Sequence, residues 1–240
     1  MSKISGKFAV ITGASSGIGK AIALDWIDQG GQACLLGRDL ARLEGVVVEA
    51  RASASQVSCL QVDLLDETIV REVCGQILNE YSHVDLLIHS AGMVTLGKVE
   101  FAPVADFDRQ YQVNVKAPYL LTQLLLPKLR AAMGQVVFIN SSAGLNAGCD
   151  FSQYAATKHA LKAVADSFRQ EVNDDGIRVI SVYPGRTASP MQEAVCRMEG
   201  RPYRPEHLLQ PEDVSSALIN AVSLPSSAEI TDLNIRPMKK

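Results

Sequence analysis

Short apolar segments alternate with longer helical segments along the whole chain, and this alternation constrains the fold more than any other feature. Each short segment is rich in valine, isoleucine or leucine and is apolar throughout, not only at every second position. Strands that are apolar on both faces are typical of a parallel sheet covered by helices on both sides. The seven expected strands are residues 8–12, 33–36, 57–62, 84–89, 135–140, 178–183 and 229–235.

The segments between these strands place apolar residues three and four positions apart, which is the spacing of amphipathic helices. The expected helices are residues 17–29, 39–52, 66–81, 106–131, 153–174 and 211–223. Since strand–helix–strand crossovers are right-handed, this order predicts a doubly wound (Rossmann) α/β fold with a seven-stranded, mostly parallel sheet and helices on both faces. No repeat or linker-like segment interrupts the pattern, so we expect residues 1–240 to form a single domain.

Residues 184–210 belong to the least regular part of the chain. The stretch "YPGRTASPMQEAVCRMEGRPYRPEHLLQP" (183–211) holds five prolines and directly follows the sixth expected strand. It therefore leaves the carboxyl edge of the sheet, where ligands bind in open α/β folds. We expect residues 184–210 to form a substrate loop.

Charge and hydropathy exclude several classes of function. The chain has a formal net charge of -3, a pI of about 5.8 and no basic run, so a nucleic-acid partner is not expected. It also lacks an apolar run of membrane-spanning length or a secretory leader. These features predict a soluble, cytoplasmic protein with a small-molecule partner and no membrane contact.

The five cysteines are an odd number and include no Cys-x-x-Cys pair. This pattern argues against a disulfide framework and against a zinc site. We therefore expect free thiols and no bound metal. Cys149 is of interest because it lies in the loop that follows the fifth expected strand.

A glycine-rich turn lies between the first strand and the first helix. "VITGASSGIGKAIA" places Gly13, Gly17 and Gly19 there, where bare backbone N–H groups and the positive end of the helix dipole suit a pyrophosphate. After the second strand, Gly37 takes the place of the usual acidic residue and Arg38 follows. An arginine at this point can pair with a 2'-phosphate, which favours NADP, with NAD as the alternative if Arg38 is only a solvated side chain.

Tyr154 and Lys158 stand one helical turn apart on one face of the expected helix 153–174. Tyrosine has a pKa of about 10, and a nearby ammonium favours the phenolate, which brings the group closer to acid–base chemistry at neutral pH. The spacing alone is weak evidence. However, Ser141 ends the fifth strand thirteen residues before Tyr154, and Asn114 is an amide within an otherwise apolar helix, where a buried polar group needs a partner.

With these residues, the chain resembles the short-chain dehydrogenase/reductase family over essentially its whole length. "TGASSGIG" matches the family's cofactor motif, and "YPGRTASPM" matches the segment that holds the nicotinamide carboxamide. The family's catalytic tetrad corresponds in order and spacing to Asn114, Ser141, Tyr154 and Lys158. The cofactor contacts that the resemblance implies are Thr12, Gly13, Ser15, Ser16, Gly17, Ile18, Gly19, Arg38, Asp63, Leu64, Ser90, Ala91, Gly92, Tyr154, Lys158, Pro184, Gly185, Thr187 and Ser189.

The resemblance implies a hydride transfer between the nicotinamide and a carbonyl or secondary alcohol. Tyr154 would transfer the proton to or from the substrate oxygen, and Ser141, preferred over Ser142 for its spacing, would polarise that oxygen. Lys158 would lower the tyrosine pKa and bind the nicotinamide ribose, and Asn114 would hold a water of the proton relay. The alternative is a nucleotide-sensing or scaffolding member without turnover, although such members usually lose the tyrosine or the lysine.

Two features depart from the family pattern. His89 and Ser90 replace a pair of asparagines, and we expect His89 to be structural or to lie at the cofactor's edge. The end "EITDLNIRPMKK" lacks the glycine-rich ending of tetrameric members, so a homodimer through the helices starting near 110 and 153 is as plausible as a homotetramer.

The expected substrate residues are Ser141, Leu145, Phe151, Tyr154 and Met191, which suit a partly apolar ketone, aldehyde or alcohol. Arginines 197, 201 and 204 would meet an anionic substrate or form a solvated face.

Overall fold

The structure, a computed structural model, describes residues 3–51 and 56–238. Its seven strands form one sheet with the order β3-β2-β1-β4-β5-β6-β7, and every neighbouring pair is parallel. This confirms the predicted doubly wound fold, with a sheet that is parallel throughout. The strands are β1 (Phe8–Thr12), β2 (Gln32–Gly37), β3 (Val57–Gln61), β4 (Leu86–His89), β5 (Gln135–Ile139), β6 (Arg178–Pro184) and β7 (Asp232–Ile235).

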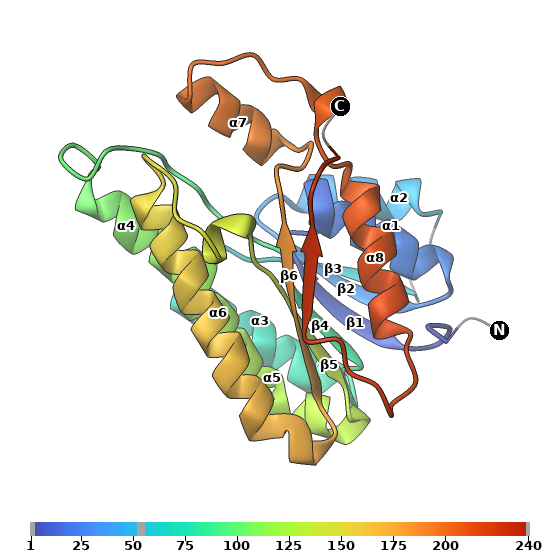
Figure 1. The fold of residues 1–240 in the computed structure, drawn as a ribbon. Helices are drawn as coiled ribbons and strands as arrows, with labels where there is room; N and C mark the ends of the chain where they lie inside the picture. The colour runs from blue at the N-terminus through green and yellow to red at the C-terminus, as the bar shows by residue number, and fades with distance from the viewer. Residues whose placement is uncertain (1–2, 52–55, 239–240) are drawn as a thin grey trace.

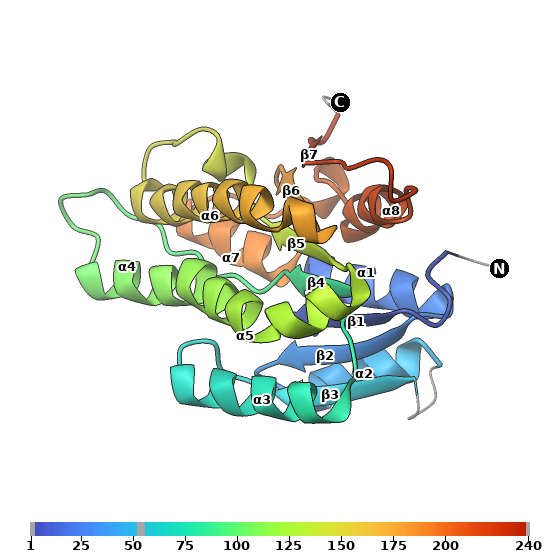
Figure 2. The same ribbon diagram turned by 90° about the horizontal axis from the view of Figure 1, so that it is seen from below.

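Helices cover both faces of the sheet (Figures 1 and 2). The helices are α1 (Gly17–Asp28), α2 (Leu40–Glu49), α3 (Glu67–Glu80), α4 (Val104–Tyr111), α5 (Ala117–Ala132), α6 (Ser152–Val172), α7 (Pro190–Met198) and α8 (Pro211–Val222). One core lies between the sheet and α1, α2 and α8, and the other lies between the sheet and α3, α5 and α6. Within β1, Ala9 and Ile11 enter the first core while Phe8 and Val10 enter the second. The central strands are therefore apolar throughout because both of their faces are buried.

The expected helix over residues 106–131 is interrupted. It begins earlier as α4, passes through a π-helical turn over Gln112–Lys116 and continues as α5. The apolar spacing that predicted one helix continues through the wider turn, so periodicity does not reveal it. Single π-helical turns inside α-helices are frequent at functional sites, and this one contains Asn114. The last expected residue of the helix 39–52 lies outside the described residues.

The expected irregular segment after β6 contains the helix α7, which the proline content did not predict. Two of its prolines start helices, since Pro190 begins α7 and Pro205 begins a 3-10 turn. Proline is favoured at the first helical position because its missing N–H has no partner there in any case. Figure 1 shows α7 standing beyond the carboxyl ends of the strands.

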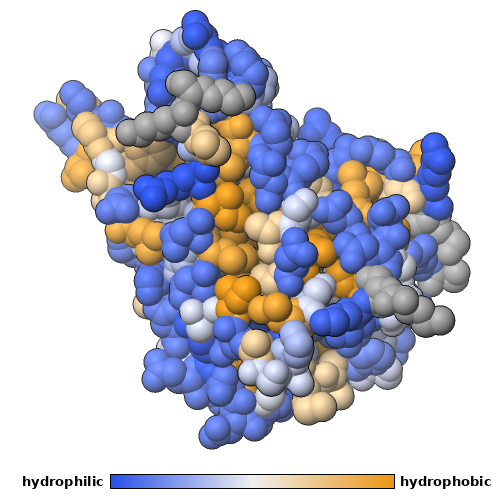
Figure 3. All heavy atoms as spheres, turned by 45° about the vertical axis from the view of Figure 1, so that its right-hand side comes forward, coloured by the Kyte–Doolittle hydropathy of each residue, from blue (hydrophilic) through white to orange (hydrophobic). Residues whose placement is uncertain are grey.

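The last strand is shorter than the expected 229–235 and lies at the edge of the sheet. Glu229 lies before this strand, and its carboxylate accepts hydrogen bonds from the Val179 N–H (3.0 Å) and from the Asn173 amide (3.2 Å). Leu233 and Ile235 in β7 are only partly buried. Figure 3, in which the side of α8 comes forward, shows a band of hydrophobic residues between more polar surfaces. None of the helices in the described ranges is both long and apolar enough to cross a membrane.

Candidate active site

The glycine-rich turn packs against the segment that follows β4. Gly13 has a φ of +68°, and a Cβ atom there would lie 2.7 Å from the Ala91 nitrogen. A Cβ atom on Gly19 would lie 2.4 Å from the Gly13 carbonyl oxygen. Since no larger residue fits at either position, the spacing of these two glycines follows from the close approach of the backbone as well as from any ligand.

Thr12 and Ser16 take different parts at this turn. The Thr12 hydroxyl is buried and accepts hydrogen bonds from the N–H groups of Ser90 and Ala91, each at 3.1 Å. Thr12 thus ties the end of β1 to the segment that follows β4. Ser16 is the N-cap of α1, and its side chain makes no capping hydrogen bond. The first N–H groups of α1 are therefore left for an anion.

The residues after β2 and β3 lie at the same edge of the sheet. Arg38 is exposed, and none of the carboxylates in the described ranges forms an ion pair with it. The Arg38 carbonyl accepts a hydrogen bond from the Gln61 side chain at 2.8 Å, which ties the two strand ends together. Asp63 is partly buried and accepts from the Leu65 N–H at 3.0 Å, while Leu64 packs in the core.

Ser141, Tyr154 and Lys158 meet beyond the end of β5. Ser141 lies just after this strand and contacts the Tyr154 phenol through its hydroxyl. The Lys158 ammonium lies 5.8 Å from the centre of the Tyr154 ring and donates a hydrogen bond to the Ile139 carbonyl at 2.9 Å. Ser142 is exposed and begins a 3-10 turn, so the structure brings Ser141, and not Ser142, to the tyrosine.

Burial dominates the acid–base properties of this pair. It raises the pKa of Tyr154 above its usual value, while the hydrogen bond with Ser141 acts in the opposite direction. Burial also lowers the pKa of Lys158 to about 8. Because burial penalises the charged forms of both groups, the net shift of the Tyr154 pKa is upward, and the lowering of this pKa by Lys158 stays a prediction.

Asn114 lies in the π-helical turn and is almost completely buried. Its amide oxygen accepts from the Met93 N–H at 2.8 Å. Its amide nitrogen donates to the Met93 carbonyl at 2.8 Å and to the Thr157 hydroxyl at 3.0 Å. Both amide hydrogens are thus in use, so the side chain has no donor left for a water molecule. Any water held at this residue would need its backbone carbonyl or the second lone pair of the amide oxygen.

The segment after β6 is held by local hydrogen bonds. The Thr187 hydroxyl donates to the Gly185 carbonyl at 3.0 Å, and the Ser189 hydroxyl accepts from the Gln192 N–H at 3.1 Å as the N-cap of α7. Arg186 forms a bidentate ion pair with Glu199 at the C-terminal end of α7, and the distance between Arg186 Nη1 and Glu199 Oε2 is 2.8 Å. Sequence reasoning missed this pair because thirteen residues separate its members and no motif links them.

Apolar side chains from two segments border the site. Leu145 and Met191 are each 39% exposed, and Phe151 lies edge-on to Tyr154 with ring centres 6.5 Å apart. A Cβ atom on Gly92 would lie 3.7 Å from the Met191 methyl group and 4.0 Å from the Lys158 ammonium. Residues of α7 and of the segment after β4 therefore face the same space as the lysine.

His89 is a buried residue at the end of β4. Its ring stacks on Phe138 with centres 5.0 Å apart, and one ring nitrogen is hydrogen-bonded to the Thr122 hydroxyl at 2.8 Å. Burial lowers the pKa of His89 to about 3, so the ring is neutral at physiological pH. These contacts favour the structural role among the two that the sequence left open.

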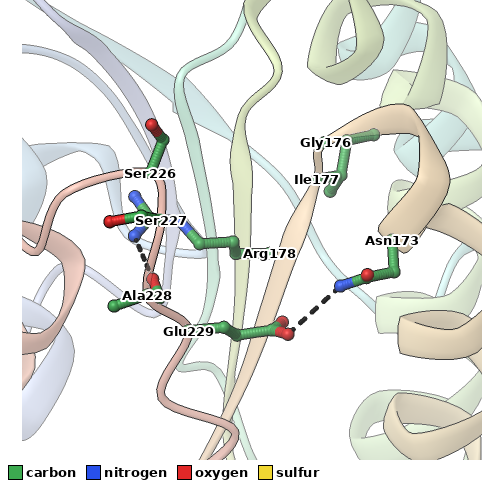
Figure 4. Close-up of a pocket in the computed structure, with 8 residues that line it drawn as sticks. All are labelled: Asn173, Gly176, Ile177, Arg178, Ser226, Ser227, Ala228 and Glu229. Atoms are coloured by element: carbon green, nitrogen blue, oxygen red, sulfur yellow. Dashed lines mark hydrogen bonds between the residues drawn. The ribbon is translucent and has the colours of Figure 1, made fainter.

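A pocket of about 260 Å³ lies at the opposite end of β6, away from these residues (Figure 4). Arg178 donates to the carbonyls of Leu224, Pro225 and Ala228 at 2.9–3.3 Å, and Glu229 is bonded to Asn173. Both charged groups of the pocket are therefore engaged in holding the connection between α8 and β7.

Comparisons with known proteins agree with this geometry. The family model described as short chain dehydrogenase matches residues 7–200. The chain belongs to the short-chain dehydrogenase family. An uncharacterised oxidoreductase of Staphylococcus epidermidis is 29% identical over 99% of this chain and 100% of its own length.

Two solved structures of this family have the same fold. An alcohol dehydrogenase from the archaeon Thermococcus sibiricus, complexed with 5-hydroxy-NADP, has a TM-score of 0.88 and 25% identity over 97% of both chains. A metagenomic short-chain oxidoreductase in complex with NADP has a TM-score of 0.85 and 29% identity over the full length of both chains. This chain is thus similar to solved oxidoreductases over nearly its whole length.

Proposed function

We propose that this protein transfers a hydride between NADP(H) and a carbonyl or secondary alcohol, with Tyr154 as the general acid and base. One observation carries the proposal: Ser141, Tyr154 and Lys158 come together at the carboxyl edge of the sheet. The glycine-rich turn that precedes α1 lies at the same edge. The related oxidoreductases solved with NADP or 5-hydroxy-NADP support the choice of cofactor.

The residues at this edge fit a dinucleotide. The N-terminus of α1, with its uncapped Ser16, suits the pyrophosphate. Arg38, exposed and free of ion pairs with described carboxylates, suits a 2'-phosphate. By the resemblance to the family, Asp63 would contact the adenine, and Thr187 and Ser189 would contact the nicotinamide carboxamide. When bound, the nicotinamide supplies or accepts the hydride.

The protein's own groups would handle the proton. Because burial raises the Tyr154 pKa, the phenol keeps its proton at neutral pH and can donate it to a carbonyl oxygen. Ser141 would hold that oxygen by a hydrogen bond, and the Lys158 ammonium would stabilise the phenolate that remains. The π-helical turn at Asn114 would place a water for the return of the proton through its backbone.

The apolar border of the site supports a mid-sized, partly apolar substrate. Leu145, Phe151 and Met191 provide apolar surface beside the tyrosine, and Cys149 is exposed in the same loop. The test is to mix the protein and NADPH with a broad panel of ketones and aldehydes and to follow the loss of reduced nicotinamide. Tight NADPH binding without turnover of any panel member would favour the alternative, a nucleotide-sensing or scaffolding protein.

The rate of carbonyl reduction is expected to fall as the pH rises through about 8. In this range Lys158 loses its proton in the free protein, and the positive charge that would stabilise the phenolate is lost. The measurement is the pH profile of kcat/KM, which reports groups of the free enzyme. A Lys158→Arg variant keeps its charge, so its residual activity should lack this decline. A decline near pH 8 that persists in Lys158→Arg would assign the titration to another group.

We also propose a homodimer through the helices that start near 110 and 153, at the face where the π-helical turn and α5 lie beside Val164 of α6. This face carries a pocket of about 360 Å³ with Tyr111, Val115, Tyr119 and Leu120 in its lining. Tyr111 is 40% and Tyr119 is 55% exposed, and exposed aromatic groups around an apolar hollow are typical of interfaces. Sedimentation should give twice the mass of the chain, and Tyr119→Asp should shift it to the monomer. Val48→Asp, on the exposed side of α2, is the matched control. A monomeric unmodified protein would contradict the proposal, and four copies would indicate a second interface.

A further inference from the structure

Two buried side-chain amides lie one turn apart and face the segment after β4. Gln110 is 0% exposed and Asn114 is 1% exposed. The Gln110 amide oxygen accepts from the Thr95 N–H at 3.1 Å, and its nitrogen donates to the Thr95 hydroxyl at 2.6 Å. Asn114 pairs in the same manner with the N–H and carbonyl of Met93. The two amides thus bind alternate residues, Met93 and Thr95, of the segment after β4.

The same two amides also bind α6. Gln110 donates to the Gln153 amide oxygen at 3.1 Å, and Asn114 donates to the Thr157 hydroxyl at 3.0 Å. Gln153 directly precedes Tyr154, just as Thr157 directly precedes Lys158. Each amide of the π-turn region is therefore linked to a residue next to one member of the tyrosine–lysine pair.

Gln153 closes the link on the other side. Its amide nitrogen donates to the Pro103 carbonyl at 2.9 Å, at the end of the segment that starts at Met93. The Gly97 N–H also donates to the Asp150 carbonyl at 2.9 Å. The loop 93–103 is thus attached at Met93 and Thr95 to the two buried amides, at Pro103 to Gln153, and at Gly97 to the loop before α6. Figures 1 and 2 show α4 running beside the first turns of α6, and in Figure 1 the loop that leads into α4 lies above that helix.

Packing alone does not account for Gln110. An apolar side chain would fill the same space between α4 and α6 without the cost of burying an amide. The described contacts use both amide hydrogens and the oxygen of Gln110, so the side chain is fully committed to the loop and to Gln153. A fully satisfied buried network of this kind gives its members one fixed arrangement.

We propose that Gln110 is a positioning residue, which acts through Gln153 to hold Tyr154 and the loop 93–103 in the geometry of the active site. The proposal rests on the function proposed above. Gln110 does not touch the reacting atoms. It fixes the first turn of α6 and the segment beside Gly92, between which the substrate would lie. Small displacements of a proton donor from its productive position lower the rate of the chemical step.

The kinetic test compares Gln110→Met with a matched control, Gln170→Met, at an exposed position of the same residue type on α6. In Gln110→Met, kcat for carbonyl reduction should fall about 10- to 100-fold per NADPH-binding site, with the dissociation constant of NADPH unchanged. Gln170→Met should match the unmodified protein. A purely structural role would reduce the number of NADPH-binding sites and leave kcat per site unchanged, and that result would overturn the proposal.

Gln153→Met provides a second variant at a partly buried position, should Gln110→Met fail to fold. It should also lower kcat, and the loss in the double variant should be smaller than the product of the two single losses, since both changes break the shared Gln110–Gln153 bond. Losses that multiply in the double variant would contradict the proposed route through Gln153.

Hydrogen exchange separates this inference from the function on which it rests. In Gln110→Met, backbone amides of residues 93–97 and 152–157 should exchange faster than in the unmodified protein, while those of α8 should not change. If no carbonyl is turned over but exchange accelerates at these two segments, Gln110 does hold them in place and the proposed function fails. If carbonyls are reduced but neither exchange nor kcat changes in Gln110→Met, the positioning role is overturned and the proposed function stands.

Discussion

Replacing Tyr154 with phenylalanine is expected to lower carbonyl-dependent NADPH oxidation by about 100- to 10,000-fold, the range contributed by a positioned general acid. The substitution removes only the hydroxyl, so the ring keeps its edge-on contact with Phe151. Ser141 and Lys158 remain, but neither can supply the proton in the place of the phenol. The measurement is the steady-state rate for the best substrate of the carbonyl panel.

Cofactor binding should survive this change. NADPH binding, followed by the fluorescence of the reduced nicotinamide, is expected to stay within a few-fold of the unmodified protein, because the phosphate contacts proposed above involve α1 and Arg38 and not Tyr154. Tyr119→Phe removes a hydroxyl from a tyrosine that is 55% exposed and should leave the rate unchanged. Full activity in Tyr154→Phe would remove the tyrosine from the proposed mechanism.

Replacing Arg38 with aspartate is expected to weaken NADPH binding by about 10- to 100-fold or more, since a hydrogen bond to a charged group contributes about 1.5–3 kcal/mol. The new carboxylate also repels the 2'-phosphate. NADH lacks this phosphate, so its dissociation constant should change little or improve through a hydrogen bond from the ribose 2'-hydroxyl. The measurement is a pair of binding titrations, one with each cofactor.

Arg130→Asp is the control that separates a general effect of net charge on cofactor binding from the loss of the Arg38 side chain. Arg130 lies in the last turn of α5 and pairs with Asp175 at 2.8 Å, far from the glycine-rich turn. The Arg130→Asp substitution changes the net charge by the same amount as Arg38→Asp. Both cofactors should bind to this variant as they do to the unmodified protein. Equal losses of NADPH and NADH in Arg38→Asp would rule out a contact with the 2'-phosphate.

Local sequence predicted the central strands well because they are buried on both faces, as Phe8 and Ala9 of β1 illustrate. It also predicted where Ser141, Tyr154 and Lys158 lie, since a strand end and one helical turn are short-range features. It predicted neither the π-helical turn nor α7. Both depend on positions where apolar spacing and proline content have more than one structural solution.

The consequences of burial could not be read from the sequence either. One helical turn between Tyr154 and Lys158 suggested a lowered tyrosine pKa, but burial raises it and lowers that of the lysine. The side chain of Asn114 was expected to hold a water, but its amide nitrogen donates both hydrogens, one to the Met93 carbonyl and one to the Thr157 hydroxyl. Desolvation and hydrogen-bond partners depend on what packs around a residue, and most of that comes from distant segments.

The sequence by itself determined the doubly wound fold, the glycine-rich turn and the order of the residues at the carboxyl edge, because these follow from short-range spacing and strand order. Only the tertiary structure decided what Gln110 does. Its partners Thr95 and Gln153 lie 15 and 43 residues away, and nothing in the local pattern distinguishes it from Gln112, two positions later. A side chain acquires such a role when folding brings together groups that are far apart in the chain, with every polar atom buried and paired.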